Sequence, residues 1–412
     1  MSLARMWVVL LAPLYLLSCQ TPSGHHPLQD SAQAGTERLH PFTGNAWLEI
    51  DKAAFEGNLR TLRTRLGEKT RICVVMKADA YGHGMDLLIP SLSELGVPCV
   101  GITSNDEARR ARARGFSGRL IRLRSATMDE VEDGLRYGLE EPVGNLAYAR
   151  RVSDIGKKHA RTIPMHLELD AGGMSRNGIE LVTAQGKKEV LELLRLPSLK
   201  LVGIMTHFPV EEREDILRVL ATFKEQADWV IENGNLDRSQ LTLHCANSFA
   251  TLEVPESHLD MVRVGAVLFG NSLAKYPEFK RMLQFKSRVA SVNSYPAGST
   301  VGYDRTFALK RDSRLANIPV GYSDGYSRVL SNRGHVLIRG LRHPIVGRVS
   351  MNTFMVDVTD SPAIQPGDEV VLFGKQGTSE ITRAELEEGA GTLLADQYTI
   401  WGNSNPRILK AE

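Results

Sequence analysis

Short apolar runs alternate with amphipathic stretches along the chain from residue 46 onward. The first run, AWLEID, precedes a stretch whose apolar residues recur at helical spacing, namely Phe55, Leu59, Leu62 and Leu66. Eight further runs are predicted to be buried strands, at about 71–77, 97–102, 119–124, 141–143, 163–169, 200–206, 241–245 and 261–264. Continuous apolar strands alternating with helices favour a parallel sheet covered on both faces, and eight of them favour a closed (β/α)8 barrel.

The pattern changes after about residue 283. Short alternating strands joined by Gly, Pro, Asp and Ser follow one another, as in SRLANIPV, GHVLIRG, FMVDVTD and DEVVLFG, with a helical pattern only at ITRAELEEGAGTLLADQ. We therefore expect an α/β chain in which a (β/α)8 barrel at residues 45–282 is followed by a mainly antiparallel β domain at residues 283–412. A chain of 412 residues exceeds the usual size of one core, which also favours two domains.

The N-terminus has the pattern of an export signal. MSLAR carries positive charge, WVVLLAPLYLL is apolar but shorter than the ~20 residues that span a bilayer, and small residues follow at SCQ. We predict a signal peptide at residues 1–19, a flexible tether at residues 20–44, and a periplasmic location. Both simple cleavage and lipidation of Cys19 fit this pattern.

Charge and cysteine content narrow the function classes. The 50 basic and 48 acidic residues nearly balance, which argues against a nucleic-acid-binding protein. Cys73 and Cys99 each begin an apolar strand, so a disulfide is possible in an oxidising compartment if the strands are parallel neighbours. Two buried thiols are the open alternative. We expect no metal site.

Polar residues follow the predicted barrel strands where their carboxyl ends would surround one site. They are Lys77, Arg122, Arg124, Glu168, Asp170, His207, His244, Asn247, Ser248, Arg263 and Gly265. The last two loops often hold a phosphate in this fold, and here they offer the Ser248 hydroxyl and the N–H groups of Gly265 and Ala266. A phosphate there and an amine at Lys77 predict pyridoxal 5'-phosphate, bound as a Schiff base.

In this order, VVMKADAYGHG, THF, HCANS, MVRVGA, VGYDRTF, VGYSDG and VGRVSMN resemble the alanine racemase family of pyridoxal phosphate enzymes over nearly the whole chain from residue 46. The resemblance implies two catalytic bases, Lys77 and Tyr303. It further implies cofactor contacts from Tyr81, His207, Ser248, Arg263, Gly265 and Ala266, and substrate contacts from Arg176 and Met351.

The chemistry explains these residue types. Inverting a Cα centre requires one base on each face of the substrate, and both lysine and tyrosine need their pKa values lowered by neighbouring cations and partial burial. Arg263 opposite the pyridine nitrogen would leave that nitrogen unprotonated, which favours racemisation over transamination. Because a tyrosine in a separate β domain does not easily reach its own barrel mouth, we predict a homodimer with shared sites.

Several positions resemble the periplasmic broad-specificity amino-acid racemases of this family, which act on substrates such as Lys, Arg, Ala and Met. Asn352 stands where alanine enzymes usually carry aspartate, and RLRSAT, GGMSRNG, the pair Cys73/Cys99 and the ending YTIWGNSNPR fit the same subgroup. Asp170 instead resembles alanine enzymes. We further expect Glu168 to pair with Arg176, supplying a charge that alanine enzymes take from a carbamylated lysine.

Three alternatives remain at this stage. One is a narrow alanine racemase. Another is a non-catalytic pyridoxal phosphate-binding barrel, against which the second domain argues. A third is a fold-related decarboxylase, which would place a cysteine opposite the lysine, whereas no cysteine follows residue 245. The tyrosine that completes the phosphate site in the family is not evident, since Tyr398 is a candidate but the spacing points nearer Asn403.

Overall fold

The computed structural model describes residues 44–271 and 275–411. The predicted signal peptide with Cys19, and the predicted tether up to residue 43, lie outside the described residues. Among the helices of the described part, none combines the length and apolarity needed to cross a bilayer.

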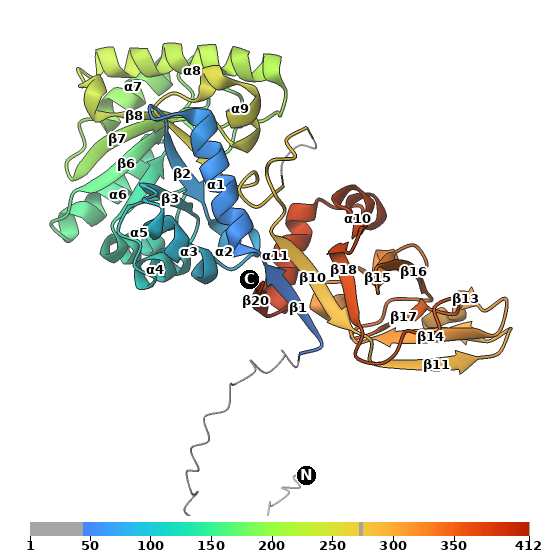
Figure 1. The fold of residues 1–412 in the computed structure, drawn as a ribbon. Coiled ribbons are helices and arrows are strands. Elements are labelled where there is room, and N and C mark those ends of the chain that lie inside the picture. Colours follow the sequence, from blue (N-terminus) through green and yellow to red (C-terminus); the bar gives the residue numbers. More distant parts are fainter. Residues whose placement is uncertain (1–43, 272–274, 412) are drawn as a thin grey trace, which may run out of the picture. The chain divides into compact units, whose positions relative to one another are not determined.

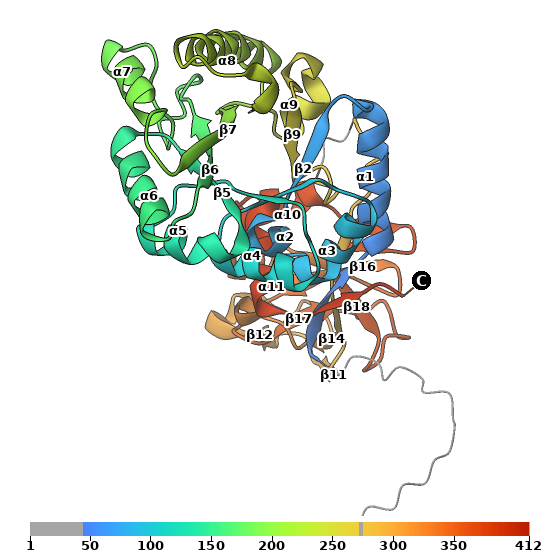
Figure 2. The ribbon, with the colours of Figure 1, turned by 90° about the vertical axis from the view of Figure 1, so that its left-hand side faces the viewer.

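Eight parallel strands form the first half of the described chain, with helices outside them (Figures 1 and 2). These strands are β2 (Arg71–Val75), β3 (Cys99–Ile102), β4 (Arg119–Arg122), β5 (Leu139–Val143), β6 (Ile163–Glu168), β7 (Leu199–Met205), β8 (Thr242–His244) and β9 (Met261–Val264). The ladder runs β8-β7-β6-β5-β4-β3-β2-β9. Two backbone hydrogen bonds, from Asp260 N to Leu243 O and from Arg263 N to Ala246 O, join β8 and β9 and bring the ends of the ladder together. The predicted barrel is thereby confirmed.

The barrel helices follow the apolar periodicity of the sequence. They are α1 (Lys52–Leu66), α3 (Met85–Glu94), α4 (Asn105–Ala113), α5 (Met128–Gly134), α6 (Leu146–Lys158), α7 (Ala184–Leu193), α8 (Arg213–Asn233) and α9 (Ser248–Glu253), with a short α2 (Lys77–Tyr81) after β2. In α1, Phe55, Leu59 and Leu62 are fully buried. The helix begins where the Asp51 side chain accepts a hydrogen bond from Ala54 N and ends at Gly67, whose φ is 68°.

The second half forms a mainly antiparallel sheet, as predicted (Figure 1). Its strands are β1 (Ala46–Ile50), β10 (Leu283–Arg288), β11 (Ser291–Tyr295), β14 (Ser313–Ile318), β15 (His335–Ile338), β16 (Leu341–Val346), β17 (Phe354–Asp357), β18 (Glu369–Gln376), β19 (Ser379–Ile381) and β20 (Arg407–Leu409), and a small hairpin pairs β12 (Thr300–Val301) with β13 (Phe307–Ala308). Two helices, α10 (Arg383–Ala390) and α11 (Leu394–Ser404), lie between β19 and β20 in the sequence. The single predicted helical stretch is divided at Gly391, which ends α10 in a left-handed conformation.

The prediction that the barrel domain begins at residue 45 is wrong for the first strand. β1 joins the second sheet instead, antiparallel to β10 with Leu48 opposite Phe285 and parallel to β20 (Figure 1). A buried strand followed by a helix looks like a barrel unit in the sequence. The choice between the two sheets depends on backbone pairing with residues more than 200 positions away, which local periodicity does not carry.

Cys73 and Cys99 form a disulfide between the neighbouring strands β2 and β3. The two residues are direct partners in the parallel register. Of the two possibilities left open by the sequence, the disulfide is therefore confirmed and the pair of free thiols is not. Cys245 is free and buried.

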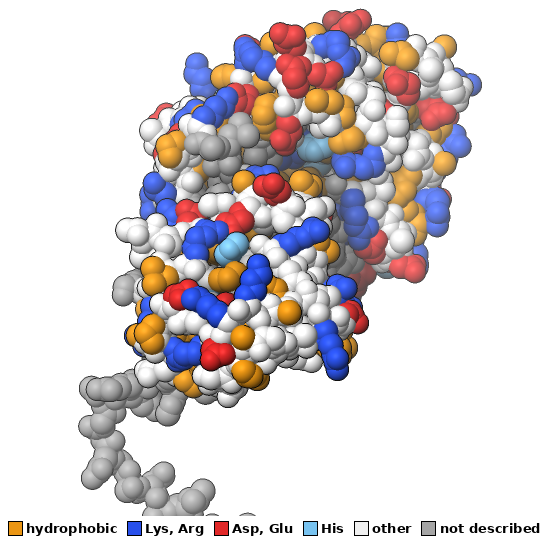
Figure 3. Space-filling view, turned by 90° about the vertical axis from the view of Figure 1, so that its right-hand side faces the viewer, with side chains coloured by type: hydrophobic (Ala, Val, Ile, Leu, Met, Phe, Trp, Pro, Cys, Tyr) orange, Lys and Arg blue, Asp and Glu red, His pale blue; other side chains and the backbone are white. Residues whose placement is uncertain are grey.

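Acidic and basic side chains are interspersed with hydrophobic ones on the face shown in Figure 3. This mixture reflects the almost balanced charge of the whole chain, with a formal net charge of +2 at pH 7.

Candidate active site

A cavity of about 230 Å³ lies at the carboxyl ends of the barrel strands. It brings together eight residues that the sequence singles out as site residues: Lys77, Tyr81, Arg176, His207, Ser248, Arg263, Gly265 and Ala266. Asn247, expected at the mouth, lines it too. Four lining residues were not predicted as site residues, namely Val75, Leu123, Met205 and Glu211.

The turn that carries Lys77 has an unusual backbone. Although Lys77–Tyr81 forms the short α2, the φ angles of residues 78–81 lie between 52° and 56°, which makes it a left-handed turn built without glycine. Such a conformation costs about 1–2 kcal/mol per non-glycine residue. Backbone strain of this kind persists only where surrounding contacts impose it, and it concentrates at functional sites.

Lys77 stands in a positively charged environment. Its side chain is open to solvent through the cavity, yet protein atoms crowd it, and this desolvation lowers the pKa of its amine. Arg176 and Arg263 lower the pKa further by charge repulsion, against a smaller opposing effect of Glu107. A lysine with a lowered pKa holds more of its amine in the neutral, nucleophilic form.

Another part of the cavity lining is rich in hydrogen-bond donors. The Ser248 hydroxyl accepts hydrogen bonds from the N–H groups of Gly265 (3.2 Å) and Val267 (3.3 Å), so these amides converge on one point. A Cβ at Gly265 would lie 2.5 Å from the Tyr81 hydroxyl oxygen, which limits this position to glycine. Burial raises the pKa of Tyr81 to about 12, so its phenol remains a donor. Converging amide and hydroxyl donors suit a phosphate group.

Arg263, on β9, is held by the barrel core. It donates to His244 Nδ1 (2.7 Å), to Thr206 O (2.9 Å) and to His207 Nδ1 (3.2 Å). Because a guanidinium can only donate, both histidines accept from it through an unprotonated nitrogen. Burial, reinforced by the charges of Arg263, Arg176 and Lys77, lowers the pKa of His207 to about 3, so that His207 is neutral at pH 7.

A chain of buried hydrogen bonds extends from Arg263 across the barrel. His244 Nε2 lies 2.8 Å from His166 Nδ1, and His166 Nε2 lies 2.8 Å from Glu140 Oε2. Arg119 donates to both oxygens of Glu140, at 2.8 and 2.7 Å. Since Arg263 donates at one end and a carboxylate accepts at the other, each histidine carries its proton on Nε2. The sequence did not reveal this chain, because it joins alternate residues of several strands.

Replacing Glu140 with glutamine is expected to destabilise the protein by roughly 3 kcal/mol at pH 7. Desolvation opposes the charge of Glu140, but hydrogen bonds from His166 and Arg119 outweigh it and lower the carboxyl pKa to about 2. The ionised carboxylate therefore stabilises the fold above its ordinary pKa of 4.5, and this contribution is lost as the pH falls towards 2. Urea unfolding midpoints at pH 7 and pH 4, at one protein concentration, measure the effect.

The difference between Glu140→Gln and the unchanged protein should shrink at the lower pH. The exposed change Glu232→Gln serves as control and should have little effect at either pH. A Glu140→Gln penalty that is the same at pH 4 and pH 7 would contradict an ionised Glu140 in this network.

The loop that carries Arg176 is organised by Asp170. Its two carboxylate oxygens accept hydrogen bonds from Met174 N (2.7 Å) and Ser175 N (2.8 Å). Asp170 thus fixes the backbone directly before Arg176, which gives this carboxylate a structural role in the loop.

The expected pairing of Glu168 with Arg176 is wrong. Glu168 is buried on β6, and no ion pair joins it to Arg176 within residues 44–271 and 275–411. Desolvation raises the pKa of Glu168 above its usual value, and the charges of Arg263 and Arg176 and a hydrogen bond with Asn177 offset this only in part. The side chain next to the arginine in sequence, Asn177, takes the hydrogen bond, and the two arginines act on Glu168 only through their charge.

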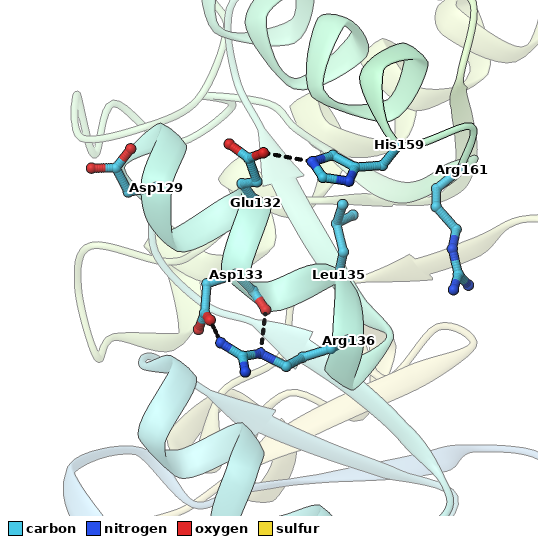
Figure 4. A pocket seen from close by; sticks show the side chains of 7 residues that line it. All are labelled: Asp129, Glu132, Asp133, Leu135, Arg136, His159 and Arg161. Carbon is cyan, nitrogen blue, oxygen red and sulfur yellow. Dashed lines mark hydrogen bonds and ion pairs between the residues drawn. The ribbon is translucent and has the colours of Figure 1, made fainter.

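A larger depression, of about 620 Å³, lies outside the barrel between α5 and the end of α6 (Figure 4). Its charged side chains mostly pair with one another, as Glu132 does with His159 at 2.5 Å and Asp133 does with Arg136. It shares no lining residue with the Lys77 cavity, and its mutually paired charges are typical of a solvated surface.

Models of the two alanine racemase domains match this chain, the N-terminal domain at residues 50–273 and the C-terminal domain at residues 282–409. The chain belongs to the alanine racemase family. It is 59% identical to a broad specificity amino-acid racemase of Aeromonas hydrophila, over 89% of this chain and 90% of that protein. It is 46% identical to a lysine racemase of Proteus mirabilis, over 99% and 100%. The alanine racemase structure from Bartonella henselae with covalently bound pyridoxal phosphate has a TM-score of 0.77 at 26% identity, over 89% and 100%.

Two residues implied by the alanine racemase resemblance do not reach the cavity of their own chain. Tyr303 and Met351 belong to the C-terminal domain, are 66% and 54% exposed, and are not among the residues that line the cavity. Nearby, Asn352 donates to the Ser323 hydroxyl at 2.8 Å, and Ser323 in turn donates to Met351 O at 2.8 Å. Asn352 is therefore tied to the segment that carries Met351.

Neither candidate for the family's phosphate-binding tyrosine lines the cavity. Tyr398 is buried between His83, Phe373 and Trp401. Asn403 lies at an exposed position of α11. Within the described residues, the candidate phosphate donors that line the cavity all belong to the barrel.

Proposed function

We propose that this chain is an amino-acid racemase of broad substrate range that interconverts L- and D-amino acids with pyridoxal phosphate. Its family and the names of its relatives support the reaction class. The observation that carries the proposal is the arrangement of one cavity, in which the activated amine of Lys77, the buried Arg263 and the donors around Ser248 lie together.

The cavity residues fit this cofactor. The Ser248 hydroxyl, the Tyr81 phenol and the amides of Gly265 and Ala266 would hold the phosphate, and the missing side chain of Gly265 leaves room for the Tyr81 phenol beside it. Arg263 would face the pyridine nitrogen. Bound through Lys77, the cofactor supplies an electron sink that acidifies the Cα–H bond of an amino acid.

Racemisation then needs a base on each face of the substrate. Lys77 serves one face, and Tyr303 of the partner subunit would serve the other, since Tyr303 is exposed and does not line its own chain's cavity. Met351 of the partner subunit, which is likewise exposed and outside its own chain's cavity, would bind the substrate carboxylate. We therefore propose a homodimer whose two sites are each built from both subunits.

Arg263 would influence which reaction follows proton removal. Its guanidinium keeps its protons, because the carbonyl of Thr206 and two neutral histidines accept hydrogen bonds from it and none of them is a stronger base. A ring nitrogen held opposite Arg263 would therefore stay unprotonated. This would limit the charge that the ring can take up and would favour return of the proton to Cα, and hence racemisation.

Initial rates on alanine, lysine, arginine and methionine, followed by chiral chromatography, test the function. An absorbance spectrum recorded alongside detects cofactor bound to the amine of Lys77. We expect turnover of all four amino acids, in both directions. Turnover of alanine alone would make the protein a narrow alanine racemase, and a cofactor spectrum without turnover would overturn the catalytic proposal.

Glu211 is expected to favour basic substrates. It is the only carboxylate among the described residues that line the cavity, where the other charged groups are cations. Glu211→Gln should lower kcat/KM for lysine and arginine up to about fivefold, the effect of one exposed ion pair, and leave alanine unchanged. Glu212→Gln, which alters the N-cap of α8 next to it, is the matched control. An equal loss on alanine and lysine would contradict a role in substrate choice.

We also propose that the protein is exported, on the strength of the charged start and apolar core of residues 1–19. Fractionation of cells should place the activity in the periplasmic fraction. Replacing Cys19 with alanine distinguishes a lipid anchor, which this change would remove, from simple cleavage. Activity confined to the cytoplasmic fraction would contradict export.

A further inference from the structure

The C-terminal strand of the chain contacts the turn that carries Lys77. Arg407, on β20, donates from Nε to Gly82 O at 2.8 Å, and its Nη2 lies 2.7 Å from Asp79 Oδ2. Residues separated by more than 320 positions in sequence thus meet at the end of the left-handed turn.

Asp79 is the centre of this contact. Besides Arg407, its carboxylate binds Arg110 of α4, with Oδ1 at 2.8 Å from Nη2, and accepts a hydrogen bond from Met85 N at 2.8 Å. Both carboxylate oxygens are therefore engaged with groups from three parts of the chain. Asp79 itself has a φ of 55°, in the left-handed region that non-glycine residues disfavour. Its side chain is thus anchored at a position where its backbone is strained.

The packing leaves the turn little room to relax. A Cβ at Gly82 would lie 1.9 Å from Tyr398 O of α11, and one at Gly84 would lie 2.7 Å from Cδ of Arg407. The turn is thus in close contact with both α11 and β20, the last two elements of the C-terminal domain. His83 lies buried in the same turn. Its Nδ1 donates to the carbonyl oxygens of Ala80 and Tyr81, which further fixes the backbone of the turn.

We propose that Arg407 and Asp79 are positioning residues, which hold the left-handed turn in place and thereby keep the Lys77 amine in the cavity. The inference rests on the proposed racemase function only for its effect on turnover. The effect on the turn itself follows from the contacts alone. The C-terminal domain, which carries Tyr303, would then also hold Lys77 of its own chain in place. The positions of both bases would therefore depend on the packing of the C-terminal domain.

Arg407→Gln and Asp79→Asn, singly and combined, test the proposal, with Arg407→Lys as the conservative variant. Lys410→Gln is a matched control, since Lys410 lies just beyond β20 and pairs with Asp51 at 2.8 Å, away from the Lys77 turn. Two readouts need no turnover. One is amide hydrogen exchange over residues 78–85 of the cofactor-free protein. The other is the rate at which added pyridoxal phosphate is trapped on Lys77 by borohydride, read by mass spectrometry.

We expect Arg407→Gln to speed exchange in the turn, slow the trapping of Lys77 and lower kcat, each roughly tenfold, with KM little changed. Arg407→Lys should fall between Arg407→Gln and the unchanged protein. The effect of the double variant should be smaller than the sum of the two single effects, because both changes break the Arg407–Asp79 ion pair, while each also weakens a contact of its own. Thermal unfolding checks that each variant is folded. If Arg407→Gln does not fold, the comparison is made with Arg407→Lys alone.

Exchange and trapping rates equal to those of Lys410→Gln would overturn the proposal. So would independent, additive effects of the two changes. If the unchanged protein has no racemase activity but Arg407→Gln still loosens the turn and slows trapping, the racemase function fails while the positioning role stands.

Discussion

Replacing Lys77 with alanine is expected to lower kcat for every amino acid by at least about 10³-fold, the combined loss of a general base and of the covalent attachment of the cofactor. Lys77 is the only lysine among the described residues that line the cavity. Its amine is activated by desolvation and by the charges of Arg176 and Arg263, and no neighbouring lysine can replace it there. Chiral chromatography measures the rate, and the absorbance spectrum reports the loss of cofactor bound to an amine.

Two variants make this result specific. Lys77→Arg keeps the positive charge but not a nucleophilic amine, so it should be as inactive as Lys77→Ala. Lys69→Ala removes an exposed lysine just before the other end of β2 and should leave turnover unchanged. Substantial racemisation by Lys77→Arg would show that no covalent step at this residue is required.

The parts of the fold that the sequence predicts are those encoded by local pattern. Several barrel strands are buried on both faces and therefore appear as largely apolar runs, as β3 does, which is buried at every position. Strand β1 has the same local appearance but belongs to another sheet, because its partners are chosen by distant backbone pairing. The local pattern therefore predicts that a segment is a strand more reliably than it predicts which sheet the strand joins.

The site divides in the same way. Lys77, Ser248 and Gly265 stand at strand ends, where topology alone brings them together, and the structure places all three around one cavity. The left-handed turn after Lys77 had no signal, since Ala-Asp-Ala-Tyr contains none of the glycine that usually marks positive φ. Its contact with Arg407 joins opposite ends of the chain, beyond the reach of any local pattern.

The Glu168 error has a physical cause as well. Charge type and rough proximity suggested a pair with Arg176, and the two charges do influence each other. The orientation of the loop is set by Asp170 through two backbone hydrogen bonds, and sequence spacing does not reveal that geometry. A hydrogen bond with Asn177 results instead of an ion pair.

Replacing Tyr303 with phenylalanine is expected to lower racemisation in both directions by about 10²–10⁴-fold, the usual contribution of one general acid or base. Lys77 would still exchange the Cα proton of one enantiomer. In deuterated water the variant should therefore label one enantiomer of a substrate without inverting it. Mass spectrometry of the separated enantiomers measures this. Loss of exchange from both enantiomers alike, or full racemisation, would contradict a second base at Tyr303.

A mixed dimer decides whether the two bases come from different subunits. When Lys77→Ala and Tyr303→Phe chains are combined, shared sites predict one site that lacks both bases and one in which both are intact. A heterodimer purified through two different tags should then regain about half of the wild-type activity, although each parent homodimer is nearly inactive. If Tyr303 instead reached Lys77 of its own chain, each site would lack one base and no activity would return. The 66% exposure of Tyr303 and its absence from the described lining of the cavity favour the first outcome.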